Sequence, residues 1–135
     1  TRVVNARETL MPAKRFSKPV LAALDATKYL GIRSGPEHRF IAVWPLVLGG
    51  RVFIRSWNNK PTGWYRAFLE EPRGALQLPG GRQVNVRARP VRSQRIIEAM
   101  EDAYAEKYDT RGSRKYVVGF RRPRRRATTM ELLPR

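Results

Sequence analysis

The most constraining feature of the sequence is a pair of apolar segments joined by two glycines. Residues Phe40–Leu48 are rich in β-branched and aromatic side chains, and Arg51–Trp57 continues in the same manner after Gly49-Gly50. Two such segments on either side of a glycine pair are typical of a β-hairpin, because glycine adopts the positive φ angles of tight turns. The sequence therefore predicts a long hairpin at the centre of the molecule.

Shorter elements are predicted on both sides of this hairpin. Ser17, with Pro19 in the first turn, marks the start of a helix that ends near Ala26. Ser93 begins a longer helix with apolar residues at helical spacing, among them Ile97, Met100 and Tyr104. A third helix spans Trp64–Glu71 before Pro72, and further strands are expected at Tyr29–Arg33, Gly74–Leu78, Arg82–Val91 and Thr128–Leu133.

These elements predict an α+β fold. Five or six antiparallel strands would form a barrel or strongly curved sheet, with two or three helices at its edge. Closing the sheet would remove exposed strand edges. At 135 residues the chain has room for one domain, which we expect at residues 15–135 after a basic N-terminal arm at residues 1–14.

Charge and composition exclude several classes of protein. The net charge is +17, from 28 Lys and Arg against 11 Asp and Glu. The absence of cysteine excludes disulfides and thiolate sites, and a single histidine, His38, excludes a multi-histidine metal centre. No apolar segment reaches the about 18 residues of a membrane span, and no secretory signal begins the chain, so we expect a cytoplasmic protein.

A chain this basic is expected to attract anions, although a merely solvated basic surface remains the alternative. Sequence-independent binding of nucleic acid is one interpretation, since alternate residues of a strand share a face. The candidate residues are Arg82, Arg87, Arg89, Arg121, Arg122, Arg124, Arg125 and Arg126. Catalysis by paired carboxylates is not supported, because Glu70 and Glu71 are adjacent and diverge by about 100° on a helix. If this is an enzyme, its reactive centre belongs to a bound cofactor.

Several ordered motifs resemble one bacterial family. They are Phe40–Trp44, Arg51–Ser56, Gly63–Arg66, Ala103–Tyr108 and Thr128–Arg135. Together they resemble the family known as domain of unknown function 2255, which is distantly similar to split β-barrel proteins that bind flavin mononucleotide (FMN) or the deazaflavin coenzyme. The resemblance implies a split β-barrel, an oxidoreductase-like activity that depends on a flavin or deazaflavin, and a homodimer. It also implies that the arginine run lies in a loop before a last strand.

The same resemblance implies a set of cofactor-binding residues. Gly31–Gly35 resembles the phosphate loop of deazaflavin-dependent reductases, with Ile32 and Arg33 where that loop has Arg and Lys. The implied residues are Arg33, Ser34 and Arg39 for the phosphate, and Arg55, Ser56, Trp64, Tyr65 and Arg66 for the ring pocket. Two alternatives stay open: an ordinary turn at residues 34–38, and a core role for Trp64 beside Phe68. Trp44 and Trp57 are expected to be structural.

Overall fold

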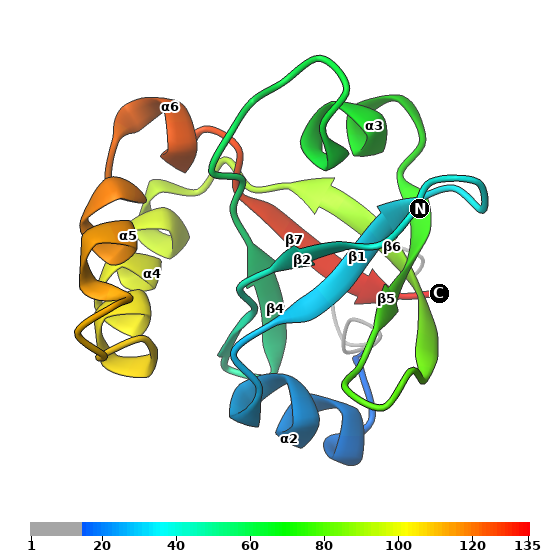
Figure 1. The fold of residues 1–135 in the computed structure, drawn as a ribbon, viewed down its shortest axis with the longest axis horizontal. Helices are drawn as coiled ribbons and strands as arrows, with labels where there is room; N and C mark the ends of the chain where they lie inside the picture. Colours follow the sequence, from blue (N-terminus) through cyan, green and yellow to red (C-terminus); the bar gives the residue numbers. More distant parts are fainter. Residues whose placement is uncertain (1–14) are drawn as a thin grey trace, which may run out of the picture.

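An antiparallel sheet of seven strands curls into a half-barrel in the computed structural model, which describes residues 15–135 (Figure 1). The predicted arm at residues 1–14 lies outside the described residues. The order across the sheet is β2-β1-β5-β6-β7-β4-β3. The strands are β1 Leu30–Ser34, β2 Ile41–Val43, β3 Leu46–Leu48, β4 Arg51–Ile54, β5 Arg73–Gln77, β6 Gln83–Pro90 and β7 Met130–Pro134. This architecture confirms the predicted α+β class and the curved antiparallel sheet, with seven strands where five or six were expected and, among the described residues, five helices where two or three were expected.

Five helices surround the described part of the sheet. They are α2 Lys18–Ala26, α3 Trp64–Glu70, α4 Gln94–Lys107, α5 Arg114–Gly119 and α6 Pro123–Arg126. The predicted caps are confirmed, because Ser17 Oγ accepts the N–H of Val20 and Ser93 Oγ accepts the N–H of Ile96. Helices α2 and α3 lie at opposite ends of the half-barrel, while α4 and α5 lie along one side (Figure 1).

The predicted central hairpin is only partly correct. The Gly49-Gly50 turn forms between β3 and β4, with φ angles of 57° and 76°. However, Phe40–Leu48 is not one strand: β2 pairs with β1 at one edge of the sheet, and β3 pairs with β4 at the other edge. The centre of the sheet is occupied by β6. The prediction that the hairpin forms the middle of the barrel is therefore wrong.

The chain turns a corner at Trp44-Pro45, between β2 and β3. Proline has no N–H to donate to a ladder, so a strand through this point would lose a hydrogen bond. Tyr108 and Lys107 hold the corner, since Tyr108 Oη and Lys107 Nζ donate to the carbonyl of Pro45 at 2.9 and 2.8 Å. The Trp44 ring also stacks on the Tyr108 ring, with centroids 4.0 Å apart. The last turn of α4 therefore decides where the apolar segment bends.

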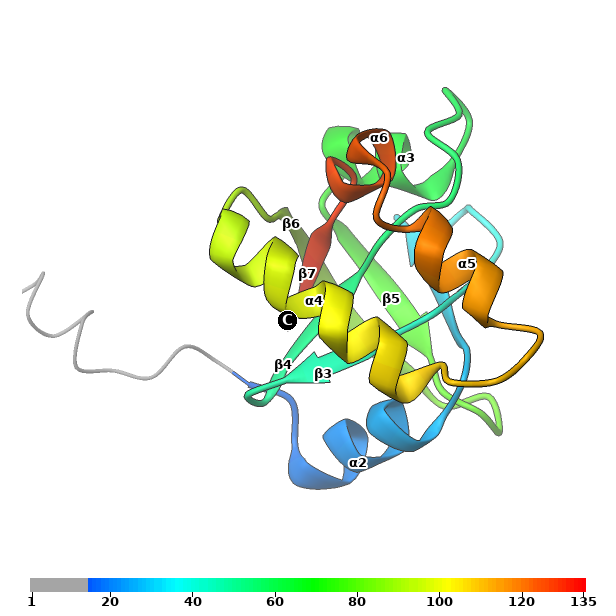
Figure 2. The same cartoon turned by 90° about the vertical axis from the view of Figure 1, so that its left-hand side faces the viewer.

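Two apolar cores stabilise the molecule. The larger core fills the half-barrel and includes Leu24 of α2, Ile32 of β1 and Phe68 of α3. The smaller core lies between α4, α5 and the β3–β4 edge, where Met100 and Tyr104 are fully buried. Figure 2 shows α4 lying across this edge of the sheet. The predicted apolar face of α4 is thus confirmed, but it packs at the edge rather than at the centre.

The segment between α4 and β7 differs most from the prediction. Residues 111–120 contain α5, which the sequence analysis did not predict, and Pro123–Arg126 form the helical turn α6 where a loop was expected. The apolar signal of α5 is confined to a few residues, such as Val117 and Phe120, among charged neighbours. Such a short helix depends on tertiary packing for its stability. Across the described residues, no helix combines the length and apolar character that crossing a bilayer requires.

Candidate functional site

A cavity of about 610 Å³ opens between β2, the loop that follows β4, and α5. We name it the aromatic cavity. Six aromatic side chains line it: Tyr29, Trp44, Trp57, Trp64, Tyr116 and Phe120. Its polar lining includes Arg39 and Lys60, both exposed, and its volume falls within the range of about 300 to 1000 Å³ that is typical of small-molecule sites.

Contacts among the aromatic rings fix the walls of this cavity. Trp44 meets Tyr116 and Phe120 edge to face, with centroids 6.0 and 5.9 Å apart. Trp57 meets the same two rings at 5.2 and 5.4 Å. Trp64, at the start of α3, packs against the main core and meets Phe68 at 6.3 Å. The walls are therefore anchored by both cores, as a preformed site requires.

Arg55 lies beneath the aromatic cavity and is only 2% exposed. Its guanidinium donates to Thr129 Oγ1 at 2.9 Å and to the carbonyl of Phe120 at 3.0 Å, and it meets Glu101 at 3.5 Å. Burial lowers the pKa of Arg55, and electrostatic interactions with Tyr104 and Glu101 partly offset this effect. Because its donors already have partners within the protein, Arg55 connects β4 to β7, α4 and α5 beneath the cavity.

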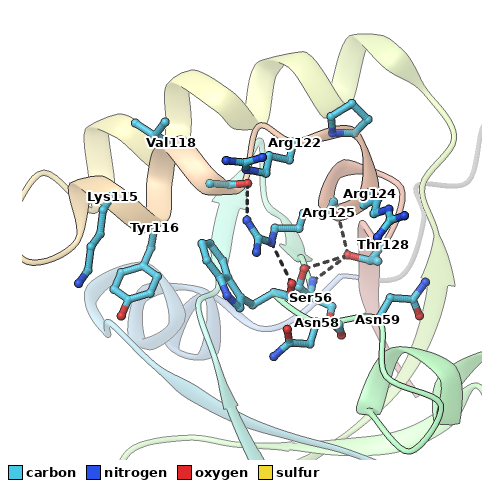
Figure 3. A pocket seen from close by; sticks show the side chains of 13 residues that line it. Ser56, Asn58, Asn59, Lys115, Tyr116, Val118, Arg122, Arg124, Arg125 and Thr128 are labelled. Carbon is cyan, nitrogen blue, oxygen red and sulfur yellow. Dashed lines mark hydrogen bonds between the residues drawn. The ribbon is translucent and has the colours of Figure 1, made fainter.

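A second cavity of about 1000 Å³ adjoins the first and shares Ser56, Trp57, Asn58 and Tyr116 with it (Figure 3). We name it the arginine cavity, because its lining carries Lys115, Arg122, Arg124 and Arg125. The Arg125 guanidinium lies 3.4 Å from the centre of the Trp57 ring and donates to the carbonyls of Trp57 and Gly119 at 2.9 and 3.1 Å. The position of Arg125 is therefore well defined.

A model of one bacterial family matches residues 20–132. The chain belongs to the DUF2255 family. That family is described as "Uncharacterized protein conserved in bacteria", and no curated protein matches the chain significantly.

Two solved structures share the fold of this DUF2255 protein. The conserved hypothetical protein Rv2991 from Mycobacterium tuberculosis is 13% identical, with a TM-score of 0.54 over 90% of this chain and 81% of that one. An FAD-binding protein (mll6688) from Mesorhizobium loti is 15% identical, with a TM-score of 0.52 over 93% of this chain and 94% of that one. At these identities the similarity concerns the fold alone.

The cofactor-binding residues implied by the sequence are dispersed. Arg39, Arg55, Ser56 and Trp64 line the aromatic cavity. Ser34 and Arg66 instead line a separate cavity of about 310 Å³ beside the β1–β2 turn. Arg66 Nε donates to Oδ1 of Asn59, a residue of the arginine cavity, at 2.6 Å. Six of the eight residues expected to form one site are thus divided between these two cavities. The other two, Arg33 and Tyr65, line neither of them.

Arg33 and Ser34 do not come together as the phosphate-loop resemblance implied. Consecutive side chains of β1 point to opposite faces of the sheet. Ser34 is buried and donates to the carbonyls of Ala67 and Glu71 at 3.1 and 2.7 Å, at the end of α3. Arg33 stacks on the Phe40 ring at 4.4 Å on the other face. Arg33 and Ser34 therefore do not share one face of the sheet, as the predicted phosphate loop would need.

The remaining predicted residues also have identifiable surroundings. Tyr65 Oη donates to the carbonyl of Ala127 at 3.3 Å, outside the aromatic cavity. Among the nucleic-acid candidates, Arg82 and Arg87 are exposed, and Arg89 pairs with Glu131 at 2.7 Å. Arg121 and Arg126 pair with Glu101, while Arg122, Arg124 and Arg125 line the arginine cavity. Three of the eight arginines thus pair with carboxylates.

The sequence analysis missed several residues of the two cavities. Trp57 was expected in the core, yet it lines both cavities. Its position directly before the turn-rich segment 58–63 was the one available signal, because large aromatic side chains beside loops commonly form binding sites. Lys115 and Tyr116 belong to α5, which was not predicted. Within residues 15–135 no cluster of three or more potential metal-ligating side chains occurs.

Proposed function

We propose that this DUF2255 protein binds a flavin or deazaflavin coenzyme in the aromatic cavity. The observation that carries the proposal is the lining itself: six aromatic side chains and two exposed cations surround one preformed cavity. A flat, conjugated ring system suits such walls, since aromatic pairs add about 0.5 to 1.5 kcal/mol beyond their burial. The fold shared with an FAD-binding protein supports the same ligand class.

Arg39 and Lys60 are the residues expected to hold a coenzyme phosphate. Both are exposed and line the aromatic cavity, and neither makes an ion pair within residues 15–135. A guanidinium and an ammonium suit a phosphate through charge-assisted hydrogen bonds. Arg55, with its donors already engaged, would keep the floor of the cavity rigid rather than contact the ligand.

The lining of the aromatic cavity contains no histidine, aspartate or glutamate. General acid–base catalysis by these side chains is therefore not part of the proposal. When bound, a flavin or deazaflavin supplies hydride transfer, and the chain would contribute binding, orientation and exclusion of water. The proposed activity is accordingly that of an oxidoreductase-like protein, whose substrate would approach through the open side of the cavity.

A comparative titration tests the proposal. Riboflavin, FMN and the deazaflavin coenzyme are titrated into the protein while flavin fluorescence or absorbance is followed. We expect all three to bind, and we expect the Arg39→Gln, Lys60→Gln variant to bind FMN about tenfold more weakly with riboflavin unchanged. The Arg82→Gln, Arg87→Gln variant removes the same charge elsewhere and serves as the control. Absence of binding by every ring compound would overturn the proposal.

Sequence-independent binding of nucleic acid is the alternative function. Its support is the exposed position of Arg82 and Arg87 and the arginine cavity, whereas Arg89, Arg121 and Arg126 already have carboxylate partners. A short DNA duplex in the same titration distinguishes the two functions, because its affinity would fall steeply with salt. The homodimer stays a prediction, for which light scattering at low and physiological salt is the test.

A further inference from the structure

We propose that the arginine cavity is a binding site for the diphosphate and base of a nucleotide. This proposal extends the proposed function. The nucleotide site itself is argued from the arginine cavity alone, whereas a single ligand that occupies both cavities rests on the proposed flavin site. A coenzyme that joins a flavin to a nucleoside through a diphosphate would then place its ring in the aromatic cavity and its nucleotide in the arginine cavity.

The lining of the arginine cavity is positively charged. Lys115, Arg122, Arg124 and Arg125 contribute four cations, and no carboxylate lines the cavity. In the part of the chain that the structure describes, none of these four residues makes an ion pair. Arg121 and Arg126, from the same segment, both pair with Glu101 on α4. The unneutralised cations are therefore gathered on the side of the segment that faces the cavity.

Contacts within the protein fix the position of Arg125 in the arginine cavity. The Trp57 ring and the carbonyls of Trp57 and Gly119 hold its Nε and Nη1, and Nη2 has no hydrogen-bond partner among residues 15–135 (Figure 3). Burial lowers the pKa of Arg125, and the positive charge of Arg122 lowers it further. Like charges held this close repel one another, and a bound anion would relieve that repulsion.

The size and composition of the arginine cavity suit a ligand larger than a phosphate group. About 1000 Å³ is far more room than a single phosphate group needs. Tyr116 is 40% exposed and Val118 is 64% exposed, so the cavity offers apolar surface as well as charge. Asn58 and Asn59 add amide groups of the kind that hydrogen-bond to base edges. A bare phosphate would leave these features unused, whereas a nucleotide has a group for each.

The two cavities lie next to each other. Ser56, Trp57, Asn58 and Tyr116 line both of them, so these residues form a wall that the two sites have in common. A ligand that extends past Trp57 would contact both cavities at once. The expected consequence is an affinity order in which FAD binds more tightly than FMN, and FMN more tightly than riboflavin.

Calorimetric titration of the protein with ADP, AMP and inorganic pyrophosphate tests the nucleotide site without a flavin. The test variant is Arg122→Gln, Arg124→Gln, because both residues are exposed and neither side chain makes a hydrogen bond or ion pair within the described residues. We expect ADP to bind more tightly than AMP, and the variant to bind ADP about tenfold more weakly. The Arg82→Gln, Arg87→Gln variant carries the same change in charge and should leave ADP binding within about twofold.

The outcomes separate this inference from the proposed function. Riboflavin, FMN and FAD binding with equal affinity, together with no ADP binding, would overturn the nucleotide site and leave the flavin proposal standing. ADP binding that depends on Arg122 and Arg124, with no binding of any flavin, would support the nucleotide site and overturn the flavin proposal. An equal loss of ADP affinity in both variants would overturn the site in favour of general charge. A single-stranded oligonucleotide that binds far more tightly than ADP would overturn it in favour of nucleic acid.

Discussion

Two groups of arginines in this protein differ in what surrounds them. In the first group a carboxylate lies among several arginines: Glu131 between Arg51 and Arg89, and Glu101 among Arg55, Arg121 and Arg126. In the second group, around the arginine cavity, no carboxylate is present. The arginines of the first group therefore take part in ion pairs that connect elements of the fold, whereas those of the second group do not.

Glu131 illustrates the first group. Its side chain is nearly buried and accepts hydrogen bonds from Arg51 Nε at 2.9 Å and from Arg89 Nη2 at 2.7 Å. Burial alone would raise the pKa of Glu131, but the hydrogen bonds from Arg51 and Arg89 hold it below its ordinary value. The carboxylate thus links β4, β7 and β6, which are neighbours in the sheet.

The largest loss of stability is expected from a substitution of Arg55. In the Arg55→Met variant the carbonyls of Phe120 and Ile97 and the hydroxyl of Thr129 lose their donor within a buried region. We expect the free energy of unfolding to fall by about 3 to 5 kcal/mol, as for the loss of one partner from a buried pair. Urea denaturation followed by tryptophan fluorescence measures the change. A loss below about 1 kcal/mol would show that water readily replaces Arg55.

The second-largest loss of stability is expected from a substitution of Glu131. The Glu131→Gln variant keeps the shape of the side chain but leaves Arg51 and Arg89 without a charged partner. We expect the free energy of unfolding to fall by about 1 to 3 kcal/mol at pH 7. The Glu71→Gln variant, which breaks an exposed pair with Arg73, is the matched control and should change stability much less, because solvent screens that pair. Equal effects of the two variants would contradict the distinction between buried and exposed pairs.

The lowered pKa of Glu131 predicts that the stability of the protein depends on pH. Because the pKa of Glu131 is lower in the folded protein than its ordinary value of 4.5, its contribution is fully present above that value. The contribution is lost as the pH falls through the folded pKa. The difference in unfolding free energy between the natural protein and Glu131→Gln should therefore shrink on acidification from pH 6 to about pH 3. A difference that stays constant over this interval would argue against the lowered pKa.

The smallest effect on stability is expected in the arginine cavity. Removing the charges of Arg122 and Arg124 breaks no ion pair among the described residues, so the Arg122→Gln, Arg124→Gln variant should unfold within about 0.5 kcal/mol of the natural protein. At low salt it should be slightly more stable, because repulsion among the cations is reduced. Thermal denaturation at two salt concentrations measures this. Strong destabilisation would place these arginines in the first group.

Local signals in the sequence were sufficient for much of the fold. Ser17 and Ser93 cap α2 and α4 because the hydroxyl of such a residue bonds within its own first turn. The corner at Trp44-Pro45 was not foreseen, since Tyr108 and Lys107, which hold it, are more than sixty residues away in the chain. The separation of Arg33 from Ser34, in contrast, follows from the alternation of a strand and could have been predicted.

By itself the sequence determined the positions of most strands, the capped helices, the Gly49-Gly50 turn and the excess of positive charge, because each depends on neighbouring residues or on composition. Only the tertiary structure decided which arginines meet a carboxylate and which line a cavity. Glu101 meets Arg55 and Arg126, and Trp57 meets Arg125, across 25 to 68 residues of chain. The partner of a long charged side chain depends on how distant elements pack, and no local pattern encodes that packing.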